Sequence, residues 1–401
     1  CTKKYPMLYY YAAYYEEKMG EDEAAKKSLE KAESCAFDYC FPNKLDDIAV
    51  LTFAIENGCK KKAPYYLGNL FYDKLQWKKS VELWEMSEKA DDTFSIVHRN
   101  LALAYYNKMG DSKAAKRELE KAFSLNRKDA RIFLELDQLY KKLGYSFKER
   151  LAKYDEDPSL AESRDDLYIE YITLMNMCGE YERAYRCIMG RRFHPWEGGE
   201  GKITTQYTIS LLEMAKQCLA SEKYEQAEKL LKKALVYPEN LGEGKLEGTK
   251  DNHLFYHLGL ALEAQGKHDE AKTCFETATI GTDEPAGAMY YNDQPADMIL
   301  YQGLAFEKLG KTREAKSRFY RLIDYGEQHL NDEGKIEYFA VSLPDFLIFD
   351  EDYTKKNRAH CCYLMALGNI GLQNREKAAE FLNEALEIEP SHMMATLYQK
   401  Q

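Results

Sequence analysis

One loop of this chain places an aromatic ring among polar side chains, an arrangement that suits sugar recognition. Trp196 lies beside His194 and Pro195 and is followed by Glu197. An indole ring can cover the apolar face of a pyranose while neighbouring polar groups bind its hydroxyls. A later loop repeats this chemistry with Tyr290, Tyr291, Asn292, Asp293 and Gln294. The alternative is that these aromatic rings fill gaps between long loops and support a rigid surface, since large aromatic residues are usually buried.

The tetrapeptide GEGK occurs twice, at residues 199–202 and 242–245, and the two copies are 43 residues apart. Its glycines could expose backbone N–H groups to a phosphate, with Lys202 or Lys245 close by. Acidic residues accompany both lysines, however, and the chain contains no GxxxxGK[ST] motif. The other interpretation is a pair of structural turns in which Glu and Lys side chains tie neighbouring loops together.

Carboxylates in the same loops could serve glycoside hydrolysis, which needs two carboxyl groups at a defined separation. They are Glu200, Glu243, Asp293, Asp297 and Asp345. Acidic loop residues are usually solvated, so binding is preferred to catalysis and no catalytic residue is assigned. The full set of predicted ligand-binding residues is His194, Trp196, Glu197, Glu200, Lys202, Asn240, Glu243, Lys245, Tyr290, Tyr291, Asn292, Asp293, Gln294, Asp297 and Asp345.

The histidines do not predict a metal site. His253 and His257 are four residues apart at the start of a predicted helix, which is a ligand-like spacing. No HExxH motif or other Glu–His pair completes the set, and such a pair is more often a capping or packing feature. We therefore predict neither a metal nor any other cofactor.

A repeat positions these loops. The segments 256–278 and 301–323 share one pattern, and Ala227, Ala271 and Ala315 occupy equivalent positions 44 residues apart. Small residues at such positions let two helices pack closely, and a glycine after the first helix of each pair predicts a left-handed C-cap. The pattern resembles the tetratricopeptide repeat, whose usual length is about 34 residues. About ten additional residues therefore recur in each repeat of this part of the chain.

The fold predicted from this repeat is an all-α, right-handed superhelical α-solenoid of about nine helix pairs, with a final covering helix in residues 391–401. The additional residues form four insertions, each after the second helix of a pair: 191–207, 237–253, 279–298 and 325–346. Because helices alternate in direction, these insertions should lie side by side on one rim. We therefore divide the chain into generic repeats (1–190) and repeats with long insertions (191–401).

Composition limits the classes of partner. A formal net charge of −11 disfavours nucleic acid, which needs a basic surface. No run of 18 apolar residues predicts a membrane span. The ten cysteines are scattered without a CxxC motif, which is typical of a reducing compartment, and we predict a cytoplasmic location. The chain starts at Cys1 and its helical pattern begins near Met7, so we expect a fragment of a longer protein, which leaves open a signal peptide before residue 1.

A narrower resemblance covers residues 191–401. The phrases FHPWEGGEGK, YPENLGEGKLEG, MYYNDQPADMILYQGLA and YFAVSLPDF occur in this order. They resemble the C-terminal half of a family of large bacterial proteins of unknown function, in which a galactose-mutarotase-like β-sandwich precedes a tetratricopeptide array. The resemblance implies a carbohydrate-related context, because such sandwiches commonly bind sugars. It supplies no catalytic residues.

Together these features predict a binding scaffold more than an enzyme. We expect the loop rim, residues 191–346, to dock a neighbouring domain, a partner protein or a sugar-like ligand. A general protein-interaction solenoid would instead bind its partner on the concave face formed by the first helix of each pair. The alternative is a carbohydrate-processing module that uses the loop carboxylates. A third possibility is a structural role, in which the insertions pack against a preceding domain.

Overall fold

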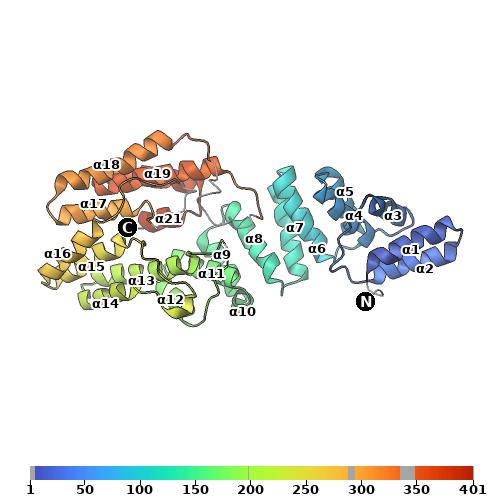
Figure 1. Ribbon diagram of the computed structural model, residues 1–401, viewed down its shortest axis with the longest axis horizontal. Helices are drawn as coiled ribbons and strands as arrows, with labels where there is room; N and C mark the ends of the chain where they lie inside the picture. Colours follow the sequence, from blue (N-terminus) through green and yellow to red (C-terminus); the bar gives the residue numbers. More distant parts are fainter. Residues whose placement is uncertain (1–4, 197, 288–293, 335–347, 401) are drawn as a thin grey trace. The chain divides into compact units, whose positions relative to one another are not determined.

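A computed structural model describes residues 5–196, 198–287, 294–334 and 348–400, and these residues form α-helices and loops without a strand (Figure 1). The predicted all-α solenoid is confirmed. The chain divides into two compact units, residues 1–140 and 141–401, and each is described by itself. This division reflects where contacts within each unit are dense. The predicted division after residue 190 separates repeats with long insertions from repeats without them, and it stays a prediction. Among the described residues, no helix has the length and apolarity to cross a membrane.

The first unit is built from helix pairs. Its helices are α1 (Pro6–Lys18), α2 (Asp22–Ser34), α3 (Leu45–Glu56), α4 (Lys62–Asp73), α5 (Trp77–Ala90), α6 (Ser95–Ala104) and α7 (Ser112–Leu125). The pairs are α1 with α2, α4 with α5, and α6 with α7. A short π-helical segment, η2 (Tyr105–Met109), extends α6, and α8 (Ala130–Lys142) spans the boundary between the units.

The second unit continues the same plan with longer connections. Its helices are α9 (Phe147–Asp155), α10 (Pro158–Glu162), α11 (Asp165–Met177), α12 (Tyr181–Met189), α13 (Lys202–Ala220), α14 (Tyr224–Ala234), α15 (Asn252–Ala264), α16 (His268–Ala278), α17 (Met298–Lys308), α18 (Thr312–His329), α19 (Tyr353–Gly371), α20 (Arg375–Ile388) and α21 (Met393–Gln399). A 3-10 turn, η3 (Glu239–Leu241), lies in the second insertion. Five successive pairs, from α11 with α12 to α19 with α20, follow the predicted repeats.

A glycine on the first helix of a pair lies against an aromatic ring on the second. Gly259 on α15 faces Phe275 on α16, and a Cβ added to the glycine would lie 2.5 Å from the ring. Gly303 on α17 faces Phe319 on α18 in the same way, at 2.3 Å. Each ring is sixteen residues after its glycine. Only the absence of a side chain lets the two helices approach this closely, because ordinary Cβ contacts are longer.

Buried alanines complete the interface within each pair. Ala227, Ala271 and Ala315, the residues that define the 44-residue period, are at most 2% exposed. The predicted left-handed glycines are also present, since Gly266 and Gly310 end their helices at φ 77° and 73°. The sequence repeat therefore records a repeated helix–helix contact.

We predict that Gly303→Ala destabilises the second unit by about 1–3 kcal/mol, because the new methyl group overpacks against Phe319. Urea denaturation of the variant and the wild type measures the change. Gly244→Ala is the matched control, since a Cβ at residue 244 meets no atom within 4 Å. Equal midpoints for Gly303→Ala and Gly244→Ala would show that the close approach contributes nothing to stability.

Candidate functional site

The first two insertions contact each other, as the rim prediction requires. The Phe193 N–H donates to the carbonyl oxygen of Asn240 at 2.8 Å. The Gly201 N–H donates to Glu243 Oε2 at 2.8 Å, so the two GEGK copies are joined directly. Gly242 fits closely against the first insertion, because a Cβ there would lie 2.4 Å from the Phe193 carbonyl oxygen. These contacts favour the structural interpretation of GEGK, a pair of tied turns.

Two asparagine amides fasten the insertions to the ends of helices. Asn240 Nδ2 donates to the carbonyl oxygens of Ile188 and Arg191, at the end of α12, at 2.9 and 3.0 Å. Asn252 Nδ2 donates to Ala278 O and Ile280 O, at the end of α16, at 2.7 and 2.9 Å. The last carbonyls of a helix have no partner within the helix, so each amide supplies donors that the fold needs. Asn240, a predicted ligand-binding residue, therefore has a structural role.

Trp196 is half-buried, and residues of its own loop cover part of the indole. A Cβ on Gly199 would lie 2.2 Å from Trp196 Cε2, and Lys202 Nζ is 5.7 Å from the ring centroid. The Lys245 ammonium pairs with Asp251 at 2.5 Å and donates to the Leu235 carbonyl oxygen at 3.0 Å. These contacts support the packing interpretation of Trp196 and a structural role for both lysines.

The remaining described candidates each contact a different part of the chain. The His194 side chain is 76% exposed, and its backbone N–H donates to Asp165 Oδ2 at 2.9 Å. Glu200 is exposed and accepts from the Gly198 N–H at 2.8 Å. Gln294 is buried and exchanges two hydrogen bonds with the backbone of Thr282. Asp297 is buried at the start of α17, away from the first two insertions in the sequence.

Six predicted residues lie outside the described residues: Glu197, Tyr290, Tyr291, Asn292, Asp293 and Asp345. Ligand binding by the predicted set therefore stays a prediction, as does a catalytic pair of carboxylates. Contacts do join the described parts of the first three insertions: the first pairs with the second, and Asn252 of the second donates to Ile280 of the third.

A second candidate surface lies on the first helices of the five pairs in residues 141–401, namely α11, α13, α15, α17 and α19. We call this surface the inner face. Helix α21 lies along it and contacts α11, α13, α17 and α19 (Figure 1). The predicted final helix is therefore confirmed, but it packs across several repeats as well as against the last pair.

One side of α21 binds the beginning of the second unit through apolar contacts. Leu397 is 4% exposed and packs with Met177 on α11 and Ile209 on α13. Met393, one helical turn earlier, packs in the same cluster, and Gln206 Nε2 lies 3.8 Å from its sulfur. Residues four apart share a helix face, so Met393 and Leu397 form one apolar stripe.

The other side of α21 binds the end of the unit. Tyr398, 7% exposed, belongs to the core formed by α17 to α20, and Met394 packs both on this core and against the Met177–Ile209–Leu397 cluster. The Tyr398 hydroxyl donates to the Tyr301 hydroxyl on α17 at 2.8 Å. The Tyr398 ring also lies 5.9 Å from the ring of Tyr363 on α19. Met394 and Tyr398 therefore form a second stripe with the same four-residue spacing.

Polar groups surround the Tyr301–Tyr398 contact. The rings of His253 and His257 lie 5.9 and 5.6 Å from the Tyr301 ring. Burial, aided by the positive charge of Lys216, lowers the pKa of each histidine to about 3, so both are neutral near pH 7. Burial raises the pKa of Asp297 to about 6. Among the described residues, His253 Nδ1 and the Tyr363 hydroxyl have no hydrogen-bond partner.

The start of α21 depends on a neutral histidine. His392 Nδ1 accepts a hydrogen bond from the Ala395 N–H at 3.1 Å and so caps the helix. Burial lowers the pKa of His392 to about 4. The neighbouring titratable groups are Tyr363 and His360 on α19 and Glu389 after α20. The unfolded chain takes up this proton near pH 6.5, so the stability from His392 is complete above that pH and is lost as the pH falls towards 4.

We predict that His392→Asn makes the stability of the chain less sensitive to acid between pH 6.5 and 4. Asparagine keeps a capping oxygen but does not titrate. Denaturation midpoints at pH 7 and pH 5 test this, with the exposed His268→Asn as the control. Equal losses on acidification in the wild type and His392→Asn would exclude this role of the cap.

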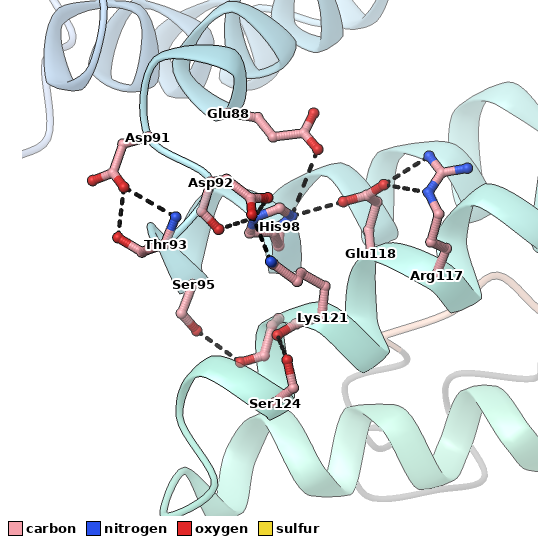
Figure 2. Close-up of polar contacts among 11 residues, drawn as sticks. Glu88, Asp91, Asp92, Thr93, Ser95, His98, Arg117, Glu118, Lys121 and Ser124 are labelled. Atoms are coloured by element: carbon pink, nitrogen blue, oxygen red, sulfur yellow. Dashed lines mark hydrogen bonds and ion pairs between the residues drawn. The ribbon is translucent and has the colours of Figure 1, made fainter.

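The first unit contains a separate charged cluster, which the sequence analysis missed (Figure 2). His98 on α6 is 1% exposed, and its Nδ1 lies 2.7 Å from Glu118 Oε2 on α7. Its Nε2 lies 3.0 Å from the Asp92 carbonyl oxygen, and Glu88 on α5 is 3.9 Å from Nδ1. Both ring nitrogens face acceptors, so the ring must carry two protons to satisfy them. No sequence motif signals the cluster, because its residues come from three helices.

Three ligand-type atoms of this cluster, from Glu88, His98 and Glu118, lie within 4.8 Å of one another, a spacing that could hold a metal ion. The charges, however, already balance. Arg117 donates from Nε and Nη2 to Glu118 at 2.8 and 2.7 Å. Burial lowers the pKa of His98, but its hydrogen bonds to Glu118 and Asp92 raise this pKa by more, so the net shift is upward. The protonated ring occupies the position that a cation would take.

We predict that Glu118→Gln lowers the pKa of His98, because it removes the charge hydrogen-bonded to Nδ1. NMR titration of the His98 ring protons measures the midpoint. Glu88→Gln is the control and should cause a smaller decrease, since Glu88 is 3.9 Å away. With its raised pKa, His98 stabilises the fold below pH 6.5, and this contribution is lost as the pH rises through the folded-state value. A larger effect of Glu88→Gln would contradict the geometry.

Comparison with known families supports the repeat assignment. A tetratricopeptide-repeat family model matches residues 100–129, 253–279 and 359–392, and a second tetratricopeptide-repeat model matches residues 297–325. The four segments correspond to α6–α7, α15–α16, α19–α20 and α17–α18. Tetratricopeptide repeats are therefore present in both units.

Several solved structures are similar to this chain. A tetratricopeptide repeat protein from Parabacteroides merdae is 14% identical, with a TM-score of 0.32, and the match covers 75% of this chain and 98% of that one. Naa15/Naa10 bound to HypK-THB matches at 12% identity and a TM-score of 0.36, covering 98% of this chain and 60% of that one. YrrB, described as a TPR protein with an unusual peptide-binding site, matches at 18% identity and a TM-score of 0.23, covering 64% of this chain and all of that one. The TM-scores are low, so none of these structures serves as a template for this chain.

Proposed function

We propose that this chain is a protein-interaction scaffold whose inner face binds a helical segment of a partner protein. The observation that carries this proposal is the position of α21 on the inner face. This helix has seven residues, which is too short for stability in water by itself. Its order therefore depends on the surface that it contacts, and that surface accepts a helix with apolar stripes.

The chemistry of the inner face suits a peptide more than a small reactive substrate. Apolar residues such as Met177 and Ile209 receive one side of a helix, and tyrosines on α17 and α19 receive the other. Tyr301 offers its hydroxyl for a directional hydrogen bond between these apolar regions. Helix-in-groove recognition uses this combination of apolar anchors and a few polar contacts.

The loop rim remains the second candidate surface, and its partner would be a neighbouring domain. The direct contacts between the first two insertions support this idea, because an ordered rim offers a defined docking surface. A sugar-like ligand, a preceding mutarotase-like domain and a bacterial cytoplasmic setting rest on the sequence resemblance and composition and stay predictions. Binding of a glycan by the wild type but not by Trp196→Ala would support the carbohydrate alternative.

The proposed function is tested by site-specific photo-crosslinking in extracts of cells that make the protein. A photoreactive residue replaces Glu213, which is half-buried on the α13 surface that carries Lys216, or Lys229, which is exposed on α14. We expect position 213 to crosslink one protein reproducibly and position 229 not to do so. The captured protein is then purified, and its binding to the unmodified chain is measured directly.

The proposed function fails if crosslinks from position 229 equal those from position 213, or if the purified candidate does not bind. A third photoreactive position at His194, exposed in the first insertion, identifies the rim instead. Capture from position 194 alone would move the binding surface to the insertions and reject the inner face.

A further inference from the structure

We infer that α21 is a self-ligand, which a partner helix of similar chemistry displaces from the inner face. This inference rests on the proposed function and specifies its partner. The partner is an amphipathic helix with two apolar stripes of four-residue spacing, one aliphatic and one ending in a tyrosine or another side chain that can hydrogen-bond. The pattern in this chain is Met393 and Leu397 on one stripe, with Met394 and Tyr398 on the other.

The contacts of α21 extend well beyond the last pair. It begins just after Pro390 and packs on α20, where Gln399 Nε2 donates to Asn383 Oδ1 at 2.8 Å, and its other side chains reach four different helices of the inner face. Lys400, beyond its end, donates from Nζ to the Met177 carbonyl oxygen at the end of α11. By contrast, Thr396 bonds only within its own turn, to the His392 carbonyl oxygen, in the described contacts. The helix therefore has a bound side and a side that contributes little.

The fit of α21 to this surface is incomplete. The Tyr363 hydroxyl, on a side chain 4% exposed, has no hydrogen-bond partner among the described residues, although its ring lies beside Tyr398. His253 Nδ1, whose ring lies 5.9 Å from the Tyr301 ring, is also without a partner in the described part of the chain. Leaving a buried polar group without a hydrogen bond is unfavourable. A partner that brings an amide or hydroxyl group to these two atoms would form the hydrogen bonds that α21 does not form.

Competition also requires that α21 can be displaced. Its short connection to α20 gives it a high effective concentration, on the order of millimolar, at its own site. A partner in solution must therefore bind the emptied face much more tightly than α21 does. The two unpaired groups and a longer helix provide the additional contacts for this difference.

The test uses the whole chain with a protease site inserted between Pro390 and Ser391. After folding, the protein is cut and mixed with a fluorescent peptide of residues 391–401, and binding is followed by anisotropy. We expect the cut chain to bind the peptide at least about tenfold more tightly than the uncut chain, because cutting removes the tether. A Leu397→Asp peptide should not bind, whereas the Thr396→Asp peptide, with the same charge one residue earlier, should bind.

A second variant covers the case in which the cut chain unfolds. The full-length Leu397→Asp chain empties the inner face without cleavage, and circular dichroism reports whether it stays folded. It should bind the wild-type peptide, and the full-length Thr396→Asp chain should not. The inference that α21 is a self-ligand fails if these two chains bind the peptide equally. It also fails if the cut, folded chain does not bind the peptide. Wild-type dimers that disappear in Leu397→Asp would also overturn it, since α21 would then occupy a second copy.

These outcomes are separate from those of the proposed function. If position 213 crosslinks a partner but the 391–401 peptide does not exchange, the scaffold proposal stands. In that case the partner does not resemble α21. An exchangeable peptide without any crosslinked partner would retain the self-ligand and reject the wider binding role.

Discussion

The structure depends on the close approach of two helices at a residue with no side chain. Gly259 and Gly303 each lie under an aromatic ring that follows sixteen residues later, and in the first unit Gly68 faces Trp84 with the same spacing. The glycine sets the distance between the helices, and the ring fills the volume above it. Once this distance is set, the small residues Ala271 and Ala315 become buried at the same interface. The pairs then present their first helices as a continuous surface.

The insertions depend on a different constraint, the unpaired carbonyls at helix ends. Each long connection must start where a second helix stops, and it must supply donors there. Asn240 and Asn252 do this with one amide each. These polar loop residues, which could also bind a ligand, are present because the helix ends need donors. The GEGK copies also have a structural role, because the Gly201 N–H donates a hydrogen bond to Glu243.

The sequence predicted the helix pairs well, because the spacing of alanines and glycines directly reflects the helix–helix contact. It also placed the insertions between pairs and suggested that they meet, but two predicted bounds are wrong. Helix α13 already begins at Lys202, inside the predicted insertion 191–207, and α18 continues to His329, inside the predicted insertion 325–346. It could not separate a binding asparagine from one that caps a helix, since both are polar residues in a loop. The face of the first helices was one of the predicted binding surfaces, but the sequence did not predict that α21 lies on it. Leu397 and Ile209 lie far apart in the chain, and no periodic pattern links them. The His98 cluster was invisible for the same reason, since three helices contribute to it.

The position of α21 also affects how the second unit folds. Repeat arrays usually gain stability from contacts between neighbours, so folding can start at any pair and spread. Here Lys400 bonds to the backbone of Met177, and Glu351 pairs with Lys142, so the last residues of the second unit contact its first helices. Such contacts between distant residues raise the contact order, which slows folding. The inner face must therefore be exposed during synthesis until α21 is made, and a partner helix present at that stage would meet it unoccupied.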